Sequence, residues 1–462
     1  MTMRNILRTA LLWALASAPG NVWPQQQAGQ ASAPGAGAAP GQTLRLSLGQ
    51  AVNIALGPEG NTRVRIAQEL IRQAHTRSAQ ARAALLPNID SSVVQQSQTR
   101  NLAAFGIRIQ LPIPGFVFPA FVGPFNVFDA RATASLAAFD LSSIRRYQAA
   151  RQGVSLAEAE KEAAQDQTRD QVARAYLAGL RAQADVDAAL ANVALSRALL
   201  KLAEDQKAAG TGTGIEVTRA KVQLANEEQR LLVAQNEQTR THLRLLRAMA
   251  LDLDVAVELT DRLSFVPAPT TPLREAIEIA LQSRTDWKAQ QLRRESARLS
   301  ASAIRSERVP SVNLFADYGS IGTGVNNAIP TRTFGFSVRV PLFDGGRRDA
   351  RREEGYTQLR QEDIRSADLR AQIELELRLA LDTLRSASAQ VSAAEGGRAL
   401  AESELAQAQR RFKAGVGSSI EVTDAQTRLE RAQENRIQAL FNFNLARIDF
   451  GSATGTIREM TK

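Results

Sequence analysis

The stretch Gly210-Thr-Gly-Thr-Gly-Ile-Glu-Val-Thr218 occurs a second time, slightly altered, as Gly415-Val-Gly-Ser-Ser-Ile-Glu-Val-Thr423. Gly415 lies 205 residues after Gly210, and the same offset relates Leu224 to Leu429. A period of this length is far longer than a solenoid repeat. The chain therefore consists of two copies of one structural unit.

The same duplication extends to the start of each copy. Leu48-Gly-Gln-Ala-Val-Asn-Ile-Ala-Leu56 matches Leu273-Arg-Glu-Ala-Ile-Glu-Ile-Ala-Leu281, and Phe139-Asp140 matches Phe343-Asp344. Each unit is expected to hold a helix, a strand pair, a very long helix, a Gly-rich tip and a shorter helix. The expected bounds are 44–250 for the first unit (strand pair 87–139, tip 208–214), 251–271 for a linker, 272–451 for the second unit (strand pair 310–343, tip 414–419), and 452–462 for a C-terminal tail.

The long segments read as helices. Residues 142–207 contain no Pro and consist mainly of helix-forming residues, so a helix of about 65 residues and about 100 Å is expected. After each tip, apolar or small residues recur at heptad spacing, and small residues in such a seam permit close helix approach. These are Val217, Ala220, Leu224, Leu231 and Ala234, and Val422, Ala425, Leu429, Ala432 and Ala439. Each unit is therefore expected to form an antiparallel helical hairpin.

Four shorter segments alternate with a period of two. Residues 333–340 and 311–318 do so clearly, and 89–98 and 128–138 more faintly. About ten residues is the length of a tilted transmembrane strand, and membrane barrels have about eight strands or more. Four strands cannot close alone, so an oligomer that shares one barrel is expected. The alternative is two soluble β-hairpins packed on a helical bundle.

The composition argues against an enzyme. The chain has no Cys, which excludes disulfides, thiol catalysis and Cys-ligated metal, and its two His, His75 and His242, lie in no motif. No catalytic, cofactor-binding or metal site is expected. The net charge of +10 comes from basic residues spread among acids, which does not favour nucleic-acid binding.

The N-terminus has the order of a secretory signal peptide. Arg4 and Arg8 precede an apolar stretch and the small residues Ala16-Ser17-Ala18, so a signal peptide is expected over 1–24, with its cleavage site left open. Residues 25–43 are rich in Gln, Ala, Gly and Pro and read as a disordered lead. Downstream, the most apolar stretch, 103–128, holds four prolines and does not suit a membrane helix.

Together these features resemble the TolC-like outer-membrane efflux family. The resemblance rests on the paired openings, on Pro341-Leu-Phe-Asp-Gly-Gly346, on Phe412-Lys-Ala-Gly-Val-Gly-Ser-Ser-Ile-Glu-Val422 and on Ala446-Arg-Ile-Asp-Phe-Gly-Ser-Ala-Thr-Gly455. It implies a mainly α fold with a membrane β-barrel part: a homotrimer whose twelve strands share one outer-membrane barrel, continued into the periplasm by an α-barrel tunnel of helical hairpins.

The resemblance also implies a passive exit duct without a cofactor, docked to a periplasmic adaptor and an inner-membrane pump. The exported class is expected to be small toxic molecules or drugs. Two alternatives stay open: an exit duct of type I protein secretion, and a non-channel periplasmic coiled-coil adaptor or scaffold. The substrate, adaptor and pump are not named by the sequence.

By resemblance, Glu421 and Asp424 match acids that narrow the tunnel entrance. They lie three residues apart, hence on one helix face, and in a trimer six carboxylates would favour cations. The alternative is two solvated acids. Glu216 and Arg219 would instead pair with acids of the neighbouring hairpin. Gly417 stands where family members can carry an Arg that ties the closed tip.

The tip glycines are expected, by resemblance, to form tight turns that the adaptor contacts. They are Gly210, Gly212, Gly214, Gly415 and Gly417. The plainer interpretation is a turn between helices, and both can hold.

The first strand pair is longer than the second. Pro87 to Phe139 spans 52 residues and Pro310 to Phe343 spans 33, so the first pair carries 19 more. Its enlarged loop, 99–128, includes Phe105, Phe116, Phe118, Phe121 and Phe125. An enlarged external loop is expected, and lengthened strands with an aromatic girdle are the alternative.

Overall fold

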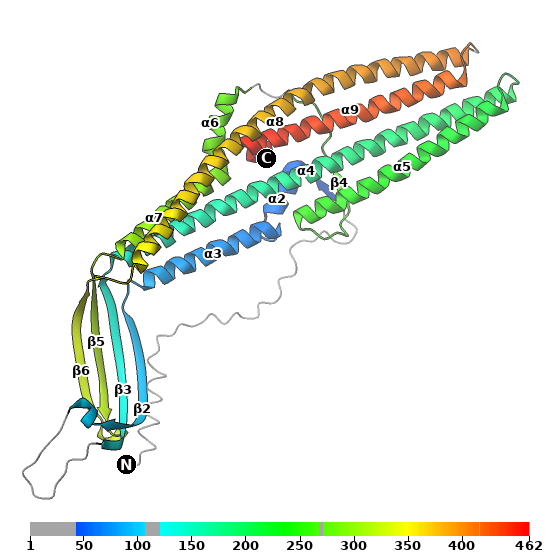
Figure 1. The fold of residues 1–462 in the computed structure, drawn as a ribbon. Helices are drawn as coiled ribbons and strands as arrows, with labels where there is room; N and C mark the ends of the chain where they lie inside the picture. The colour runs from blue at the N-terminus through cyan, green and yellow to red at the C-terminus, as the bar shows by residue number, and fades with distance from the viewer. Residues whose placement is uncertain (1–42, 107–120, 268–270, 415, 462) are drawn as a thin grey trace, which may run out of the picture.

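The computed structural model describes residues 43–106, 121–267, 271–414 and 416–461. The molecule is elongated, with a sheet at one end and the tips of two helical hairpins at the other (Figure 1). The expected signal peptide at 1–24, and the lead at 25–43 except its last residue, lie outside the described residues.

The sheet contains four antiparallel strands in the order β2-β3-β5-β6. Their bounds are Asn88–Asn101 for β2, Phe121–Phe139 for β3, Ser311–Gly322 for β5 and Ile329–Arg339 for β6. Short 3-10 turns, Ala103–Phe105 (η1) and Val325–Asn327 (η2), follow β2 and β5. All four strand regions predicted from alternation are present. Because side chains alternate along a strand, each strand places its polar residues mainly on one face of the sheet and its apolar residues mainly on the other.

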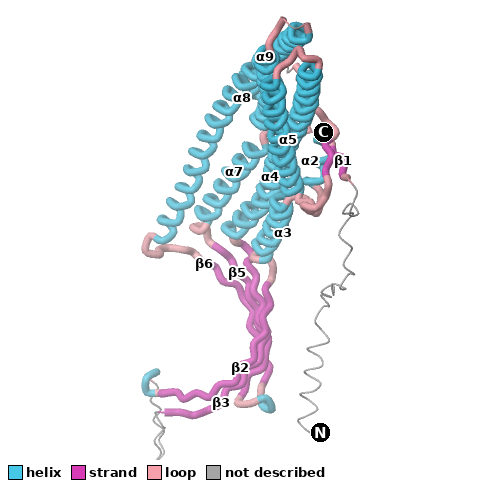
Figure 2. The backbone as a smooth tube through the Cα atoms, turned by 90° about the vertical axis from the view of Figure 1, so that its right-hand side faces the viewer, coloured by secondary structure: helices cyan, strands magenta, loops and turns pink. Residues whose placement is uncertain are grey.

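The expected extent of the loop at 99–128 is wrong at both ends. β2 continues to Asn101 and β3 already begins at Phe121. β3 pairs with β5 only from Phe128 onward, so the outer parts of β2 and β3 extend beyond the other strands and bend away (Figure 2). Part of the excess is therefore lengthened strand, while Phe116 and Phe118 lie outside the described residues.

The helices form one curved layer. The long helices α4 (Leu141–Ala208) and α8 (Arg347–Lys413) run from the sheet to the tips. Between them lie α7 (Thr285–Ser306) near the sheet and α9 (Ser419–Thr454) near the tips, and α3 (Thr62–Ala83) and α5 (Gly214–Met249) flank α4 (Figure 1). The mainly α fold class with two long antiparallel hairpins is confirmed.

No helix in the described part of the chain is long and apolar enough to cross a membrane.

The two long helices begin differently, although Phe139-Asp140 and Phe343-Asp344 match in sequence. The Asp140 carboxylate accepts the Ser142 N–H at 3.0 Å, so α4 starts directly after it. α8 starts only at Arg347, after Gly345 and Gly346 with φ of 70° and 85°. Glycine suits this left-handed backbone because it has no Cβ.

A second, two-stranded sheet was not predicted. β1 (Leu44–Leu46) pairs in parallel with β4 (Val257–Leu259), which lies in the expected linker. The strands close over α4, where a Cβ on Gly179 would lie 2.8 Å from the Leu259 Cδ1. Three-residue strands carry too little periodicity to be recognised in a sequence.

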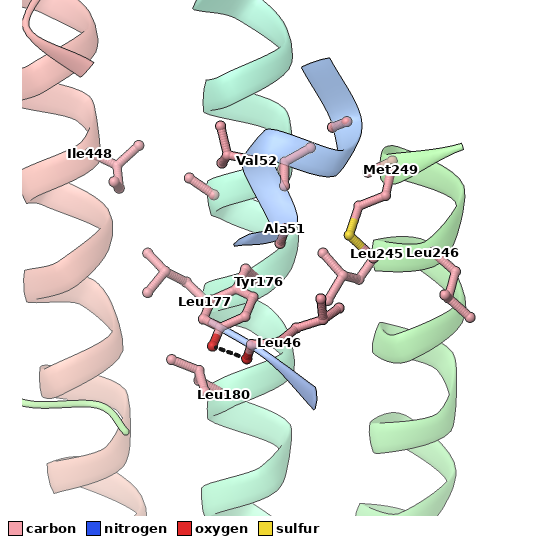
Figure 3. Close-up of a cluster of buried hydrophobic side chains, with 14 of the residues drawn as sticks. Leu46, Ala51, Val52, Tyr176, Leu177, Leu180, Leu245, Leu246, Met249 and Ile448 are labelled. Carbon is pink, nitrogen blue, oxygen red and sulfur yellow. Dashed lines mark hydrogen bonds between the residues drawn. The ribbon is translucent and has the colours of Figure 1, made fainter. Parts of the chain in front are cut away.

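The largest core surrounds Tyr176 of α4 (Figure 3). The Tyr176 hydroxyl lies 2.9 Å from the Leu46 carbonyl oxygen and 2.7 Å from the Asp261 Oδ2. α2 (Leu48–Leu56) and the end of α5 pack around it, and α6 (Leu273–Ser283) covers α8 in the second unit. The expected tail at 452–462 contains α10 (Ile457–Met460), and Ile457 is buried in this core.

Candidate functional site

The four-stranded sheet has two chemically distinct faces. Its register pairs Ser92 with Arg131 and Asp317 with Thr133, so these four side chains share one side. We name this side the polar sheet face. Its polar residues are Asn88, Asp90, Ser92, Gln96, Gln98, Asp129, Arg131, Thr133, Ser135, Asn313, Asp317, Thr331, Thr333, Ser337 and Arg339. The same side also carries Val94, Phe125, Val127, Phe315 and Ile321.

A charged cluster lies at the centre of the polar sheet face. The Arg131 guanidinium donates to the Asp129 carboxylate at 2.8 Å and to the Asp317 carboxylate at 3.2 Å. The Arg131 side chain lies over Gly319, where a Cβ would come within 2.4 Å of the Arg131 Cβ. Glycine at 319 therefore leaves the space in which this cluster forms.

The opposite side, the apolar sheet face, is exposed and apolar. Phe334 is 81% exposed and Ile89 72%. A contiguous exposed apolar surface marks contact with something other than water. Its apolar residues are Ile89, Val93, Phe128, Leu136, Val312, Leu314, Phe334, Phe336 and Val338. The same register also places Ser91, Gln95, Ser97, Ser320 and Arg332 on this side.

Both edges of this sheet are open. Among the described residues, β2 and β6 each pair on one side only, which leaves a row of backbone donors and acceptors on the other. β2 runs away from the helices and β6 runs toward them. The β6 edge of one copy is therefore antiparallel to the β2 edge of another.

The two tips are built alike. A Cβ on Gly212 would lie 3.0 Å from the Gln206 Cβ, and a Cβ on Gly417 would lie 3.0 Å from the Arg411 Cβ. At both positions the backbone of the turn passes so close to the preceding helix that a side chain would crowd it, so glycine is required. Gly210 is required by its backbone instead, with φ of 74°, and its counterpart Gly415 lies outside the described residues.

Gly214 differs from the other tip glycines. Nothing lies within 4 Å of a Cβ placed on it, and it is the first residue of α5. A side chain there would point into open space, so the turn itself does not require glycine at this position.

The charged residues at the two tips are engaged differently. The Glu421 carboxylate pairs with Arg411 at 3.3 Å, and both side chains are about half exposed. The Glu216 carboxylate accepts the Thr213 N–H at 2.8 Å and so caps α5. Position 206, which corresponds to Arg411 in the repeat, is Gln.

Asp424 and Arg219 line one shallow hollow between α5 and α9. Its volume is about 310 Å³, and Ile215, Thr218, Val222 and Ile420 also line it. Within the described residues, no carboxylate lies within 4 Å of the Arg219 guanidinium. The structure thus brings Arg219 and Asp424 to one surface without an ion pair, and places Glu216 in its own helix cap.

Sequence reasoning missed two groups of residues. The polar sheet face was not predicted, because the alternation in 89–98 and 128–138 is faint and the order of the strands in the sheet cannot be deduced from the sequence. Arg411 was missed as the partner of Glu421. Its offset from Gln206 by the repeat length of 205 residues was the available signal.

The sheet has one polar and one apolar face, and helical hairpins of about 100 Å continue from it. This combination is the fold of an outer-membrane channel protein with a helical tunnel. The sequence profile described as "Outer membrane efflux protein" matches residues 59–251 and 276–456. The chain belongs to this family, whose members are outer-membrane channels and not enzymes.

Individual relatives agree with this assignment. The chain is 26% identical to the outer membrane protein TolC of Vibrio cholerae over 302 residues. This aligned region covers 62% of this chain and 67% of that protein. The solved structure of VceC from Vibrio cholerae matches with a TM-score of 0.72 and 19% identity over 88% of this chain and 96% of VceC. That of the CmeC outer membrane channel from Campylobacter jejuni matches with a TM-score of 0.75 and 17% identity over 90% of this chain and 89% of CmeC.

Proposed function

We propose that three copies of this chain form the outer-membrane exit duct of a tripartite efflux system for small toxic molecules or drugs. The observation that carries the proposal is the sheet with two open edges and two chemically different faces. Three copies of four strands give twelve, within the range of membrane barrels. The polar sheet face then lines the lumen and the apolar sheet face contacts lipid.

Cross-linking tests the shared barrel directly. The natural chain has no Cys, so introduced pairs report on their own contacts. Asp90 of β2 is changed to Cys and combined with Cys at Thr333, Thr331, Ser337 or Arg339 of β6. At least one pair is expected to give covalent dimers and trimers on oxidation, and no single variant is. If none of the pairs cross-links between copies, the shared barrel is refuted.

Surface labelling tests the orientation. Gly324 lies in the turn between β5 and β6, at the end of the sheet far from the helices, and a Cβ there meets only the Asn327 Oδ1 at 3.8 Å. A Cys at this position is expected to react with a membrane-impermeant maleimide on intact cells. Labelling only after the outer membrane is permeabilised would favour a periplasmic scaffold.

The tips are proposed as the gate and the adaptor contact. Glu421 and Asp424 would ring the tunnel entrance, and the glycine turns would receive the tips of an adaptor hairpin. Because bulky residues at Gly212 or Gly417 collide with the turn itself, Gly214 is the sharper test of docking. A Gly214→Trp variant is expected to lose adaptor binding while a Gly214→Ser control retains it.

Susceptibility of the native host tests the transported class. Deletion of the gene is expected to raise sensitivity to small toxic compounds, and the natural chain is expected to restore resistance. If resistance is unchanged and a secreted protein disappears from the medium instead, the chain serves protein secretion.

A further inference from the structure

A buried charged cluster lies where the two hairpins of one chain meet. Glu227 of α5 and Glu430 of α9 line a hollow of about 860 Å³ bounded by α4, α5 and α9. Glu227 lies 13 residues into α5, or about 20 Å from the tip. Nearer the tip, Gln426 donates to the Ser196 hydroxyl at 2.7 Å across the same seam.

One guanidinium serves both carboxyl groups. The Arg230 Nη1 donates to the Glu430 Oε2 at 2.6 Å and to the Glu227 Oε1 at 3.1 Å. The Glu227 Oε1 also accepts from the Gln223 Nε2 at 2.9 Å. The Glu227 side chain is 0% exposed and that of Glu430 4%, so both carboxyl groups are shielded from water, while the Arg230 side chain is 53% exposed.

The other oxygen of each carboxyl group has no partner. Glu227 Oε2 and Glu430 Oε1 are buried and accept no hydrogen bond from the described residues. With both groups ionised, two negative charges face one positive charge, and an uncompensated buried carboxylate is strongly disfavoured. A proton on one carboxyl group removes one of the two negative charges and supplies an O–H donor. The described residues hold no group of three or more acids or histidines placed to bind a metal ion.

We propose that Glu227 and Glu430 form a proton-linked joint between the two hairpins, closed while the carboxyl groups share one proton and loosened when both are ionised. Glu227 holds the proton, because it is the more buried of the two and lies farther from Arg230. Burial, and then the adjacent Glu430, raise the pKa of Glu227 above its ordinary value of 4.5.

The groups around the joint add negative charge. Three further acids and one further arginine line the same hollow: Asp185 and Arg181 from α4, Glu237 from α5 and Glu434 from α9. Burial likewise raises the pKa of Asp185; Arg181 opposes this shift and Glu434 adds to it. Arg181 pairs with Asp185 at 3.7 Å and Arg240 pairs with Glu237 at 3.1 Å, which leaves Glu434 as the acid without an ion-pair partner among the described residues.

The direction of the pH effect follows from the raised pKa. A carboxyl group with a raised pKa in the closed form stabilises that form at low pH, and the contribution is lost as pH rises through the raised value. The joint is therefore tight in acid and loose at higher pH. Its consequence for channel opening rests on the proposed function, while the joint itself is a property of one chain.

Distances between spin labels test the joint in the protein purified from outer membranes. Labels are placed at Lys221→Cys on α5 and Arg431→Cys on α9, both exposed positions, and labelled chains are co-expressed with excess unlabelled chain. In the natural background, the mean label distance is expected to be longer at about pH 8 than at about pH 5. Both pH values lie above the ordinary Glu pKa of 4.5.

Three variants separate the joint from general effects of pH. Glu227→Gln and Glu430→Gln each remove one ionisable group and supply an amide donor, so both are expected to abolish the shift in distance. Glu228→Gln is the matched control: Glu228 is the next residue on α5, its side chain is 47% exposed, it pairs with Arg197, and its variant is expected to keep the shift.

Two outcomes overturn the joint: a natural chain without any shift, or a shift that persists in both Gln variants. Either result leaves the cross-linking and labelling tests of the exit duct untouched. Conversely, failure of those tests leaves the distance measurement valid for a single chain.

Discussion

α5 and α9 are each 36 residues long and follow equivalent tips, yet α9 buries fourteen residues and α5 seven. The difference comes from position in the helical layer. α9 lies between α8 and α4, whereas α5 packs mainly on α4 (Figure 1). Duplicated sequence therefore gives one interior helix and one edge helix, and the edge helix leaves apolar residues such as Leu232 and Val233 about two-thirds exposed.

The same contrast holds at the tips. The turns share their backbone design at Gly212 and Gly417, but the charges differ because one unit has Gln206 where the other has Arg411. Glu216 is left to cap its own helix, and Glu421 is drawn into an ion pair. A single substitution between repeats thus changes the role of a shared glutamate.

The largest expected effect separates the interior helix from the edge helix. Leu429→Ala is expected to cost about 2–5 kcal/mol of unfolding free energy, because Leu429 is 8% exposed inside the second hairpin. Leu224→Ala, at the matching position of α5, is expected to cost less. Denaturant unfolding of the purified protein measures both. Equal losses would mean that a neighbouring copy covers α5 as fully as α4 and α8 cover α9.

A smaller effect tests whether the tips are equivalent. Gly212→Val and Gly417→Val each force a side chain against the preceding helix, so each is expected to destabilise its turn by about 1–3 kcal/mol. Hydrogen exchange of the tip amides measures this. Gly214→Val serves as the control, since its side chain meets open space, and it is expected to leave exchange nearly unchanged. Unequal responses of the two tips would break the equivalence.

The smallest effect concerns the charges. Asp424→Asn is expected to reduce cation selectivity in planar bilayers more than Glu421→Gln, because Arg411 offsets the charge of Glu421. Arg411→Gln is expected to increase cation selectivity slightly, since it removes the positive charge that pairs with Glu421. If all three variants keep the selectivity and multivalent-cation block of the natural channel, the acids do not line the entrance.

Much of the fold was predictable because it depends on local periodicity. The long helices, the heptad seam after each tip and the alternating strands each repeat a short pattern many times, so the signal accumulates. Apolar residues at 373–381 alternate as in a strand, yet these residues belong to α8, because Ile373 and Leu377 also satisfy helical spacing and both are buried. The short strands β1 and β4 offered no such repetition.

The candidate site was less accessible to sequence reasoning. Glycine at 179 and 319 has a reason only in the folded chain, where an added Cβ would lie 2.8 Å from Leu259 and 2.4 Å from Arg131, respectively. The cluster of Glu227, Arg230 and Glu430 joins residues about 200 positions apart that are not equivalent in the repeat. No periodic pattern predicts such a contact.

The sequence by itself determined the duplication, the helical hairpins, the strands and the membership of an outer-membrane family, because these follow from patterns along the chain. Only the tertiary structure decided which sheet face is polar, which hairpin lies inside the layer and which carboxyl groups share Arg230. Register and packing are set by contacts between distant segments, and the energy of such contacts depends on burial that no local window contains.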